Sequence, residues 1–492
     1  MLPKILLALI SGLLTALSFI FPKFSFVIWF ALVPLFHLIS KSKTKQLIFC
    51  GFLFGLAFYG ASIFWVGNVT KLGLIFLLTY LSLYTLSFAL LGRYFLKKPL
   101  SIITLPCLWV ILEFLKESVW CGFSWANLGY SQYNNFYLIQ IADLWGTKFI
   151  SFLIVMFNFL IWEMVCYSRE GGKRISKAKN MAAKVSLVFI IFLSTFLYSF
   201  YRLDQLDSAD SLEIAVIQPN IAQDLKWDPS ASSYIIDKLN ILGKETPKNS
   251  LVIFPEAAWP FTVDEDSFEE LGILMSDIQR DAIIGVVSRE GDIFYNSALL
   301  FNKKGEVQEF YHKIMLVPFG EYVPLRKYLG FISVINSIGD ISRGDILHKF
   351  SYKNRKFAML ICFEDIFPLH VLSMARESDF LINITNDAWF GGEPEASQHL
   401  SIMTLRAVEN RISIVRSANT GISGWVSYRG KIKKLTKDKK ELFFADSRTF
   451  NISLTRKRSF YNKYPEVFVG FCLIFLVAVV LIFPALSSRE LS

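Results

Sequence analysis

The sequence has few of the residues that build disulfide frameworks, zinc sites or charged surfaces. Its six cysteines include no Cys-x-x-Cys pair, its five histidines show no paired spacing, and charged residues make up only 19% of the chain. These absences argue against a disulfide-stapled fold and a zinc module. The net charge of +10 does not indicate a nucleic-acid partner, because much of the basic excess lies in short loops between apolar spans, where Lys and Arg set membrane topology.

Long hydrophobic runs are what the sequence has instead. Hydrophobic residues make up 53% of the 492 positions, and phenylalanine alone occupies 47 of them. A helix that crosses a bilayer needs about 17–25 mostly apolar residues. Seven such runs precede a more polar block and one follows it, which predicts a multi-pass α-helical membrane domain. The runs are residues 5–21, 24–40, 47–66, 72–96, 100–115, 149–167, 185–201 and 467–484.

The loops between these runs predict the orientation of the chain. Three loops on one side are rich in lysine and arginine, around residues 41–45, 93–98 and 169–179. Basic loops stay in the cytoplasm, so the N-terminus is expected inside and the polar block outside. In a bacterium this means the periplasmic face of the inner membrane. The result depends on seven spans, because losing one would invert it.

Residues 211–445 show the alternating pattern of an α/β domain. Short apolar runs typical of buried strands alternate with amphipathic segments typical of helices, and such strands indicate a sheet covered on both faces. The predicted strands are 213–217, 251–254, 282–287, 296–301, 357–362, 380–384, 412–417 and 424–428; the predicted helices are 234–242, 268–280, 369–377 and 395–410. We expect a membrane domain at 1–203, a catalytic domain at 211–445, a linker at 446–466 and a C-terminal transmembrane helix at 467–484.

Three charged or nucleophilic residues follow predicted strands in this block. Cys362 is the only cysteine between residues 204 and 465, and it ends the run that starts at Phe357. Glu256 and Lys313 follow two other apolar runs in the same way, and strand ends are where ligand sites of open α/β sheets usually form. A thiol with a pKa near 8.5 needs a base or a cation to react as thiolate. Glu256 is the candidate base, and Lys313 is a candidate cation for an oxyanion.

Each residue also has a purely structural interpretation. A lone cysteine such as Cys362 is most often a small buried hydrophobic residue. Glu256 can equally be a surface carboxylate after a turn, and Lys313 a solvated loop charge. Taken singly, these interpretations are at least as good as the catalytic one.

Two further arrangements of Cys362 remain open. His312 or His399 would make a papain-like dyad with it, although neither carries the local signature of one. Cys121 would form a disulfide with it in an oxidising compartment, which would remove the nucleophile. No spacing favours that bond.

Four separated motifs of the block occur in the order and spacing of a known family. They are Phe254-Pro-Glu256-Ala-Ala-Trp259, Tyr311-His-Lys313 with residues 316–324, Ile361-Cys362-Phe-Glu364, and Thr385-Asn-Asp387-Ala-Trp389-Phe-Gly391. These motifs resemble the nitrilase, or carbon–nitrogen hydrolase, superfamily. With the spans in front and behind, the whole chain resembles the apolipoprotein N-acyltransferase family. The loop at residues 120–132 and the segment from Gln218 to Trp227 are similar to that family as well.

The resemblance implies a fold and a reaction. The fold is an α/β nitrilase-like domain, a four-layer αββα sandwich, beside a membrane domain. Cys362 would take an acyl chain from a phospholipid as a thioester, with Glu256 as base and Lys313 at the oxyanion. The α-amine of a diacylated apolipoprotein would then accept the chain. Neither ATP nor a metal is needed, so no cofactor is expected, and the partners are membrane lipid and the apolipoprotein, with no nucleic acid.

The resemblance also implies roles for residues around the triad. Glu321 and Glu364 would orient Lys313 and the amine. Trp227 and Trp389 are candidates for the acyl pocket, and Asn296 is a polar candidate for the substrate site. Packing within the domain explains these last three residues equally well.

Two other functions compete with this one. A membrane-anchored amidase or nitrilase would share the triad and use water as acceptor, although a single anchor would then suffice. A transporter or scaffold would use the outer domain only to bind a partner. The spans hold few ionisable residues, chiefly Glu113 and Glu163, and transport paths usually need more.

Overall fold

The computed structural model describes residues 1–119, 122–169, 175–205, 210–323, 326, 340–455 and 457–483. The chain forms two compact units. The helical unit consists of Met1–Gly67, Lys71–Gln205 and Ser459–Ser492, and the sandwich unit consists of Asn68–Thr70 and Leu206–Arg458.

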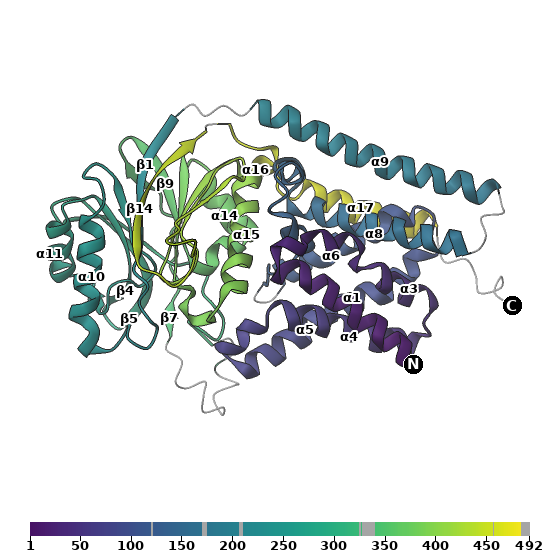
Figure 1. The fold of residues 1–492 in the computed structure, drawn as a ribbon, viewed down its shortest axis with the longest axis horizontal. Coiled ribbons are helices and arrows are strands. Elements are labelled where there is room, and N and C mark those ends of the chain that lie inside the picture. The colour runs from purple at the N-terminus through teal and green to yellow at the C-terminus, as the bar shows by residue number, and fades with distance from the viewer. Residues whose placement is uncertain are drawn as a thin grey trace. The chain divides into compact units, whose positions relative to one another are not determined.

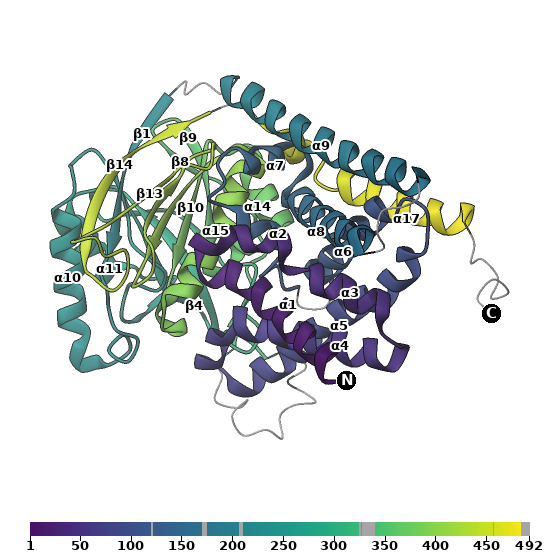
Figure 2. The same cartoon turned by 45° about the vertical axis from the view of Figure 1, so that its right-hand side comes forward.

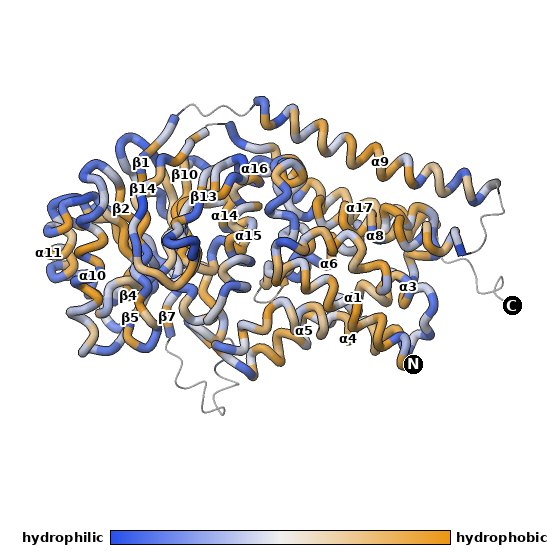
Figure 3. The backbone as a smooth tube through the Cα atoms, in the orientation of Figure 1, coloured by the Kyte–Doolittle hydropathy of each residue, from blue (hydrophilic) through white to orange (hydrophobic). Residues whose placement is uncertain are grey.

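The helical unit is built almost wholly of apolar helices, which are coloured orange along much of their length in Figure 3. Among the described residues, six segments are long and apolar enough to cross a membrane: Leu2–Ile20, Pro22–Lys41, Thr44–Ser62, Lys71–Leu96, Thr147–Arg169 and Ser176–Asp204. The helices are α1 (Leu2–Ile20), α2 (Ile28–Ala31), α3 (Val33–Lys41), α4 (Thr44–Ser62), α5 (Lys71–Leu96), α6 (Ser101–Ser118), α7 (Ala142–Trp145), α8 (Thr147–Arg169), α9 (Ile175–Asp204), α16 (Phe460–Lys463) and the shorter α17 (Val467–Ile482).

Small residues set the close approach of two of these helices. A Cβ added to Gly55 of α4 would lie 2.3 Å from Thr85 Oγ1 and 2.7 Å from Ser82 Cα of α5. Small residues at helix interfaces let backbones approach in a lipid environment, where apolar area alone does not drive helices together. Any side chain at this position would force α4 and α5 apart.

Ionisable side chains near the C-terminal end of helix α6 bind the loop that follows it. Glu113 Oε1 accepts hydrogen bonds from Trp109 Nε1 and from the backbone N–H of Leu128, each at 2.9 Å. Lys116 Nζ donates to the carbonyl oxygen of Trp125 at 2.7 Å. Because these charged groups bind the loop that follows the helix, Trp125 and Leu128 are buried within the helical unit.

The sandwich unit contains two mixed β-sheets. The first has the order β14-β1-β2-β4-β5-β6, with β3 paired to β4 and β7 to β5, and the second has the order β13-β12-β11-β10-β9-β8. The first sheet comprises β1 (Asp210–Gln218), β2 (Leu251–Ile253), β3 (Thr262–Asp264), β4 (Ala282–Glu290), β5 (Ile293–Phe301), β6 (Val307–His312), β7 (Ile341–Ser342) and β14 (Asp446–Leu454). The second comprises β8 (Phe350–Tyr352), β9 (Arg355–Ile361), β10 (Phe380–Thr385), β11 (Ser413–Ala418), β12 (Gly424–Val426) and β13 (Ile432–Lys434).

Alternation along the strands places two apolar layers on the first sheet. Ile214 and Val216 of β1 belong to the core shared with the second sheet, whereas Ala215 and Ile217 belong to the core beneath the outer helices. Successive side chains of a strand point to opposite faces, so one apolar strand supplies both cores.

Helices complete the four layers. α10 (Ser232–Lys244) and α11 (Glu269–Ile278) pack on the first sheet, and α14 (Pro368–Ala375) and α15 (Glu393–Asn410) pack on the second. Figures 1 and 2 show the two helix pairs on opposite sides of the two sheets. This arrangement confirms the predicted αββα sandwich, and each predicted strand and helix of the block overlaps an observed element.

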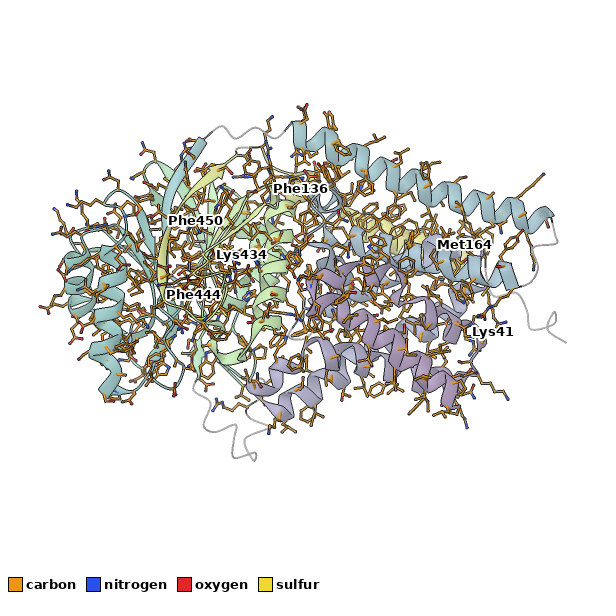
Figure 4. All side chains as sticks on the ribbon, in the orientation of Figure 1. Lys41, Phe136, Met164, Lys434, Phe444 and Phe450 are labelled. Carbon is orange, nitrogen blue, oxygen red and sulfur yellow. The ribbon has the colours of Figure 1, made fainter. Side chains whose placement is uncertain are left out.

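The structure differs from the sequence analysis at the C-terminal boundary of the sandwich. Residues 446–454, which the sequence analysis assigned to a linker, form β14 and pair antiparallel with β1 from Asp446↔Gln218 to Leu454↔Asp210. Phe450, Ile452 and Leu454 are buried at alternate positions, and Phe450 lies with Phe444 among the strands in Figure 4. The first half of the strand, Asp446 to Thr449, is wholly polar, so the sequence shows this two-residue period only over its last five residues.

Candidate active site

Cys362 lies where strand β9 of the second sheet, paired with β8 and β10, gives way to the 3₁₀ helix Cys362–Ile366. Its side chain is buried and its φ is +51°. A non-glycine residue in this left-handed region costs on the order of 1–3 kcal/mol and is typical of functional sites. The Asn383 side-chain amide holds the turn by donating to the Cys362 carbonyl oxygen at 3.1 Å.

Glu256 and Lys313 meet in the same buried region, each just past the end of a strand of the first sheet. Lys313 Nζ lies 3.3 Å from Glu256 Oε1, and the Lys313 side chain is only 1% exposed. Glu256 Oε2 accepts the backbone N–H of Asn386 at 2.8 Å. The site therefore joins residues from both sheets, because β2 and β6 deliver the charged pair and β10 delivers the backbone donor.

Glu321 and Asn296 surround this pair. Lys313 Nζ donates to Glu321 Oε1 at 2.9 Å, so the lysine lies between two carboxylates. The Asn296 side-chain amide donates to Glu256 Oε1 at 2.7 Å and to Glu321 Oε1 at 2.8 Å. Asn296, expected at the substrate site, thus also fixes the two carboxylates relative to each other.

Glu364 acts on backbone groups next to Lys313. Its Oε1 accepts the backbone N–H of Ile314 at 2.7 Å and of Met315 at 3.0 Å, and its Oε2 accepts the N–H of Ile361 at 2.8 Å. It therefore ties the segment after Lys313 to the strand that ends at Cys362. Burial opposes its ionisation, but His370 and these backbone donors hold the pKa of Glu364 below its usual value.

The electrostatics of the site favour a neutral thiol and a charged lysine. Burial and the negative charge of Glu256 raise the pKa of Cys362 well above its usual value, and Lys313 only partly offsets them. For Lys313, burial acts against the charged form, yet Glu321 and Glu256 raise its pKa above the usual value. Cys362 thus rests as a thiol, and Lys313 keeps its positive charge at neutral pH.

Lys226 is a site residue to which the sequence analysis gave no role. Its side chain is buried, and its Nζ donates to the carbonyl oxygen of Glu256 at 3.1 Å. Burial lowers the pKa of Lys226 to about 8, while Glu256 and Cys362 oppose that shift. The sequence could have pointed to Lys226, because it lies between Leu225 and Trp227 in the segment that resembles the family.

The remaining predicted residues are exposed or have other partners. Trp227 and Trp389 are 45% and 52% exposed. His312 hydrogen-bonds Ser297 and stacks on Tyr295, and His399 Nε2 lies 2.7 Å from Asp365 Oδ1. The imidazoles are thus bound to groups other than the thiol. Cys362 is a free thiol, and Cys121 lies outside the described residues.

One group of side chains has the composition of a metal site. The potential ligand atoms of Asp387, Glu395 and His399 lie within 4.8 Å of one another. Arg416 Nη2, however, lies 2.9 Å from Asp387 Oδ2 and 2.8 Å from His399 Nδ1. A guanidinium therefore already supplies the positive charge that a metal would bring to this group.

Comparison with known proteins identifies the family. The model of the apolipoprotein N-acyltransferase N-terminal domain matches residues 11–160, and the carbon–nitrogen hydrolase model matches residues 213–448. The chain is 35% identical to the apolipoprotein N-acyltransferase of Geobacter metallireducens across 99% of this chain and 96% of that protein. It is 28% identical to the protein of that name from Haemophilus ducreyi across 86% of this chain and 85% of that protein. The chain therefore belongs to the apolipoprotein N-acyltransferase family and carries a carbon–nitrogen hydrolase domain.

Proposed function

We propose that the protein transfers an acyl chain from a membrane phospholipid to the N-terminal α-amine of a diacylglyceryl-cysteine on an apolipoprotein, through a thioester on Cys362. The observation that carries the proposal is the buried grouping of Glu256 and Lys313, 3.3 Å apart, within electrostatic reach of Cys362. The family supplies the class of substrates, since its named members act on apolipoproteins.

The first half-reaction forms the thioester. Because the raised pKa of Cys362 keeps the thiol protonated, attack requires a base, and Glu256 takes the proton as sulfur adds to the ester carbonyl. Lys313 stays charged and stabilises the developing oxyanion. The carbon–oxygen bond then breaks, and Glu256 returns the proton to the leaving lyso-phospholipid.

The second half-reaction forms the amide. The apolipoprotein α-amine attacks the thioester carbonyl, Lys313 again faces the oxyanion, and Glu256 accepts a proton from the amine. The carbon–sulfur bond breaks, and the proton returns to the Cys362 thiolate. Ester, thioester and amide follow one another without ATP, because each acyl bond formed replaces one broken.

Four residues assist these steps in the proposal. Glu321 holds Lys313 toward the oxyanion, and Glu364 fixes the backbone that carries Lys313. Asn296 Oδ1 is buried and has no hydrogen-bond partner among the described residues, which suits it to accept an N–H of the amine. Trp227, with its exposed ring, contacts the acyl chain.

Trp389, which follows strand β10 of the second sheet, is the second aromatic residue proposed to contact the acyl chain.

We also propose that residues 1–203 cross the inner membrane seven times and that the catalytic domain faces the periplasm. Both substrates keep their chains in lipid, so a membrane-anchored enzyme meets them at the bilayer surface.

Trapping the acyl-enzyme tests the proposal. The detergent-purified protein is incubated with a phospholipid labelled in its acyl chain, without acceptor, next to Cys362→Ala and the matched control Cys472→Ala. A hydroxylamine-labile label is expected on the wild type and on Cys472→Ala but not on Cys362→Ala. Rapid release of free fatty acid without acceptor would favour the amidase or nitrilase alternative. No label on any folded variant would refute the thioester.

A further inference from the structure

The buried arginine of the second sheet is not used in the steps above. Arg416 lies on β11, and its side chain is 1% exposed. Two of its hydrogen bonds matter here: Nη1 donates to Asn383 Oδ1 at 2.9 Å, and Nη2 donates to Asp387 Oδ2 at 2.9 Å. Each of these side chains leads to a different residue of the catalytic triad.

The first contact leads to the nucleophile. Because Arg416 binds the amide oxygen of Asn383, the amide nitrogen of Asn383 faces the other way and donates to the Cys362 carbonyl oxygen at 3.1 Å. That carbonyl belongs to the residue with a φ of +51°. Arg416 therefore orients the side chain that holds the strained turn of the nucleophile.

The second contact leads to the base. Asp387 Oδ1 accepts from Thr385 Oγ1 at 2.8 Å, which closes the turn formed by residues 385–387. The middle residue of this turn, Asn386, donates its backbone N–H to Glu256 Oε2 at 2.8 Å. Burial alone would raise the pKa of Asp387, but Arg416 lowers it below its usual value. Asp387 thus stays ionised and keeps the turn fixed.

We propose that Arg416 is a positioning residue that links the turn of the nucleophile to the turn that binds the base. The catalytic part of this proposal rests on the proposed function of Cys362 and Glu256. The other charged or titratable groups around the guanidinium are Asp365, with Oδ2 3.5 Å from Nη1, together with Glu395 and His399 of α15. Asp365 and Glu395 compensate its charge. Asp365 also lies in the 3₁₀ helix that begins at Cys362, but its 3.5 Å contact is longer than the 2.9 Å hydrogen bonds to Asn383 and Asp387, which lead to the two catalytic turns.

Variants can separate the two contacts. Arg416→Met removes both, and Arg416→Lys keeps a charge that reaches only one partner. Asp387→Asn weakens the contact with the base turn, and Asn383→Ala removes the one with the nucleophile turn. Arg406→Met is the matched control, because the Arg406 side chain is also 1% exposed and pairs with Glu409 on its own helix.

The first measurement is the rate of acyl-enzyme formation from labelled phospholipid, per mole of folded protein. For Arg416→Met we expect a maximal rate roughly 100-fold lower, the effect of small misplacements in an active site, with an unchanged phospholipid KM. Arg416→Lys should recover part of the rate, and Arg406→Met should keep the wild-type value. An equal rate in Arg416→Met and Arg406→Met would overturn the proposal, as would a change confined to KM.

The second measurement does not depend on the proposed function. Alkylation of Cys362 by iodoacetamide, followed by mass spectrometry of its peptide, reports the geometry and protonation of the thiol directly. If the wild type forms no thioester, the proposed function fails, yet a changed alkylation rate in Arg416→Met would still support the link. An unchanged alkylation rate would refute it. If Arg416→Met does not fold, Asp387→Asn and Asn383→Ala must each show the reduced acylation rate, and wild-type rates in both would refute the link.

Discussion

At the scale of single residues, the site holds two buried lysines with opposite electrostatics. Lys313 lies between Glu256 and Glu321, which raise its pKa against the effect of burial. Lys226 is bound through its Nζ to a backbone carbonyl oxygen of Glu256, and burial lowers its pKa to about 8. The difference arises because Lys313 contacts two carboxylates directly, whereas Lys226 contacts an uncharged acceptor.

Lys226→Met should therefore stabilise the protein at neutral pH. An unfolded lysine titrates near 10.4, so the cost of burying the charge is fully present below pH 8 and disappears as the pH rises through about 10.4. At pH 7 we expect a gain of about 2 kcal/mol, since roughly 1.4 kcal/mol corresponds to each pKa unit and the lost hydrogen bond offsets part of it. Thermal melting at pH 7 and pH 10.5 measures this gain.

Lys303→Met, at an exposed position, is the control and should leave the melting temperature nearly unchanged at both pH values. A Lys226→Met protein that melts below the wild type at pH 7 would contradict the assignment. So would a difference that stays the same at both pH values.

At the scale of elements, strand β4 fixes the turn that carries Glu256, the proposed base. The backbone N–H of Gly285 donates to the Pro255 carbonyl oxygen at 3.2 Å, and the Gly285 carbonyl oxygen accepts from the Ala258 N–H at 2.7 Å. A Cβ on Gly285 would lie 2.6 Å from Glu256 Cα and 2.7 Å from the backbone nitrogen of Ala257. These are backbone atoms, so the turn itself would have to move.

Gly285→Ala should thus reduce acylation more than folding. We expect a loss of about 1–3 kcal/mol in stability from overpacking and a fall of roughly 100-fold in the rate of acyl-enzyme formation from a displaced Glu256. Both are measured on one preparation, by thermal melting and by labelling. Gly470→Ala, where an added Cβ meets nothing within 4 Å, is the control. A wild-type acylation rate in Gly285→Ala would show that the turn tolerates the displacement.

At the scale of the whole molecule, the proposed topology depends on α6. The six apolar segments alone would return the chain to the side where it starts, and a seventh span at α6 would put the sandwich unit on the opposite side. Three ionisable residues near its end, Glu113, Lys116 and Glu117, kept α6 out of the candidate spans. The first two bind the following loop, and Glu117 pairs with Lys148 of α8. Paired charges that face the protein interior are tolerated within membrane helices.

Reporter fusions test this count. Green fluorescent protein fused after Lys98 should fluoresce, because that loop is expected in the cytoplasm. Alkaline phosphatase fused after Gln205 should be active, because α9 then ends in the periplasm. The reciprocal fusions should be silent. A fluorescent fusion after Gln205, with Lys98 in the cytoplasm, would mean that α6 does not cross and that the catalytic domain faces the cytoplasm. An active phosphatase after Lys98 would instead contradict the orientation predicted for the spans before α6.

The sequence by itself determined the fold class, the family and the candidate triad. Strand and helix periods are local, so residues 213–217 and 395–410 were predicted in their correct states. Cys362, Glu256 and Lys313 could be named because each follows an apolar run. The linker prediction for residues 446–454 was wrong, because β14 gains its place from pairing with β1, more than 200 residues earlier.

Only the tertiary structure decided which groups act on the candidate triad. Glu364 binds the backbone beside Lys313, and Arg416 reaches Asn383 and Asp387 from a different strand. The sequence pattern indicates which residues are buried and the period at which they recur along the chain. The hydrogen-bond partner of each side chain depends on how the two sheets pack against each other. That packing is fixed only when the whole sandwich forms.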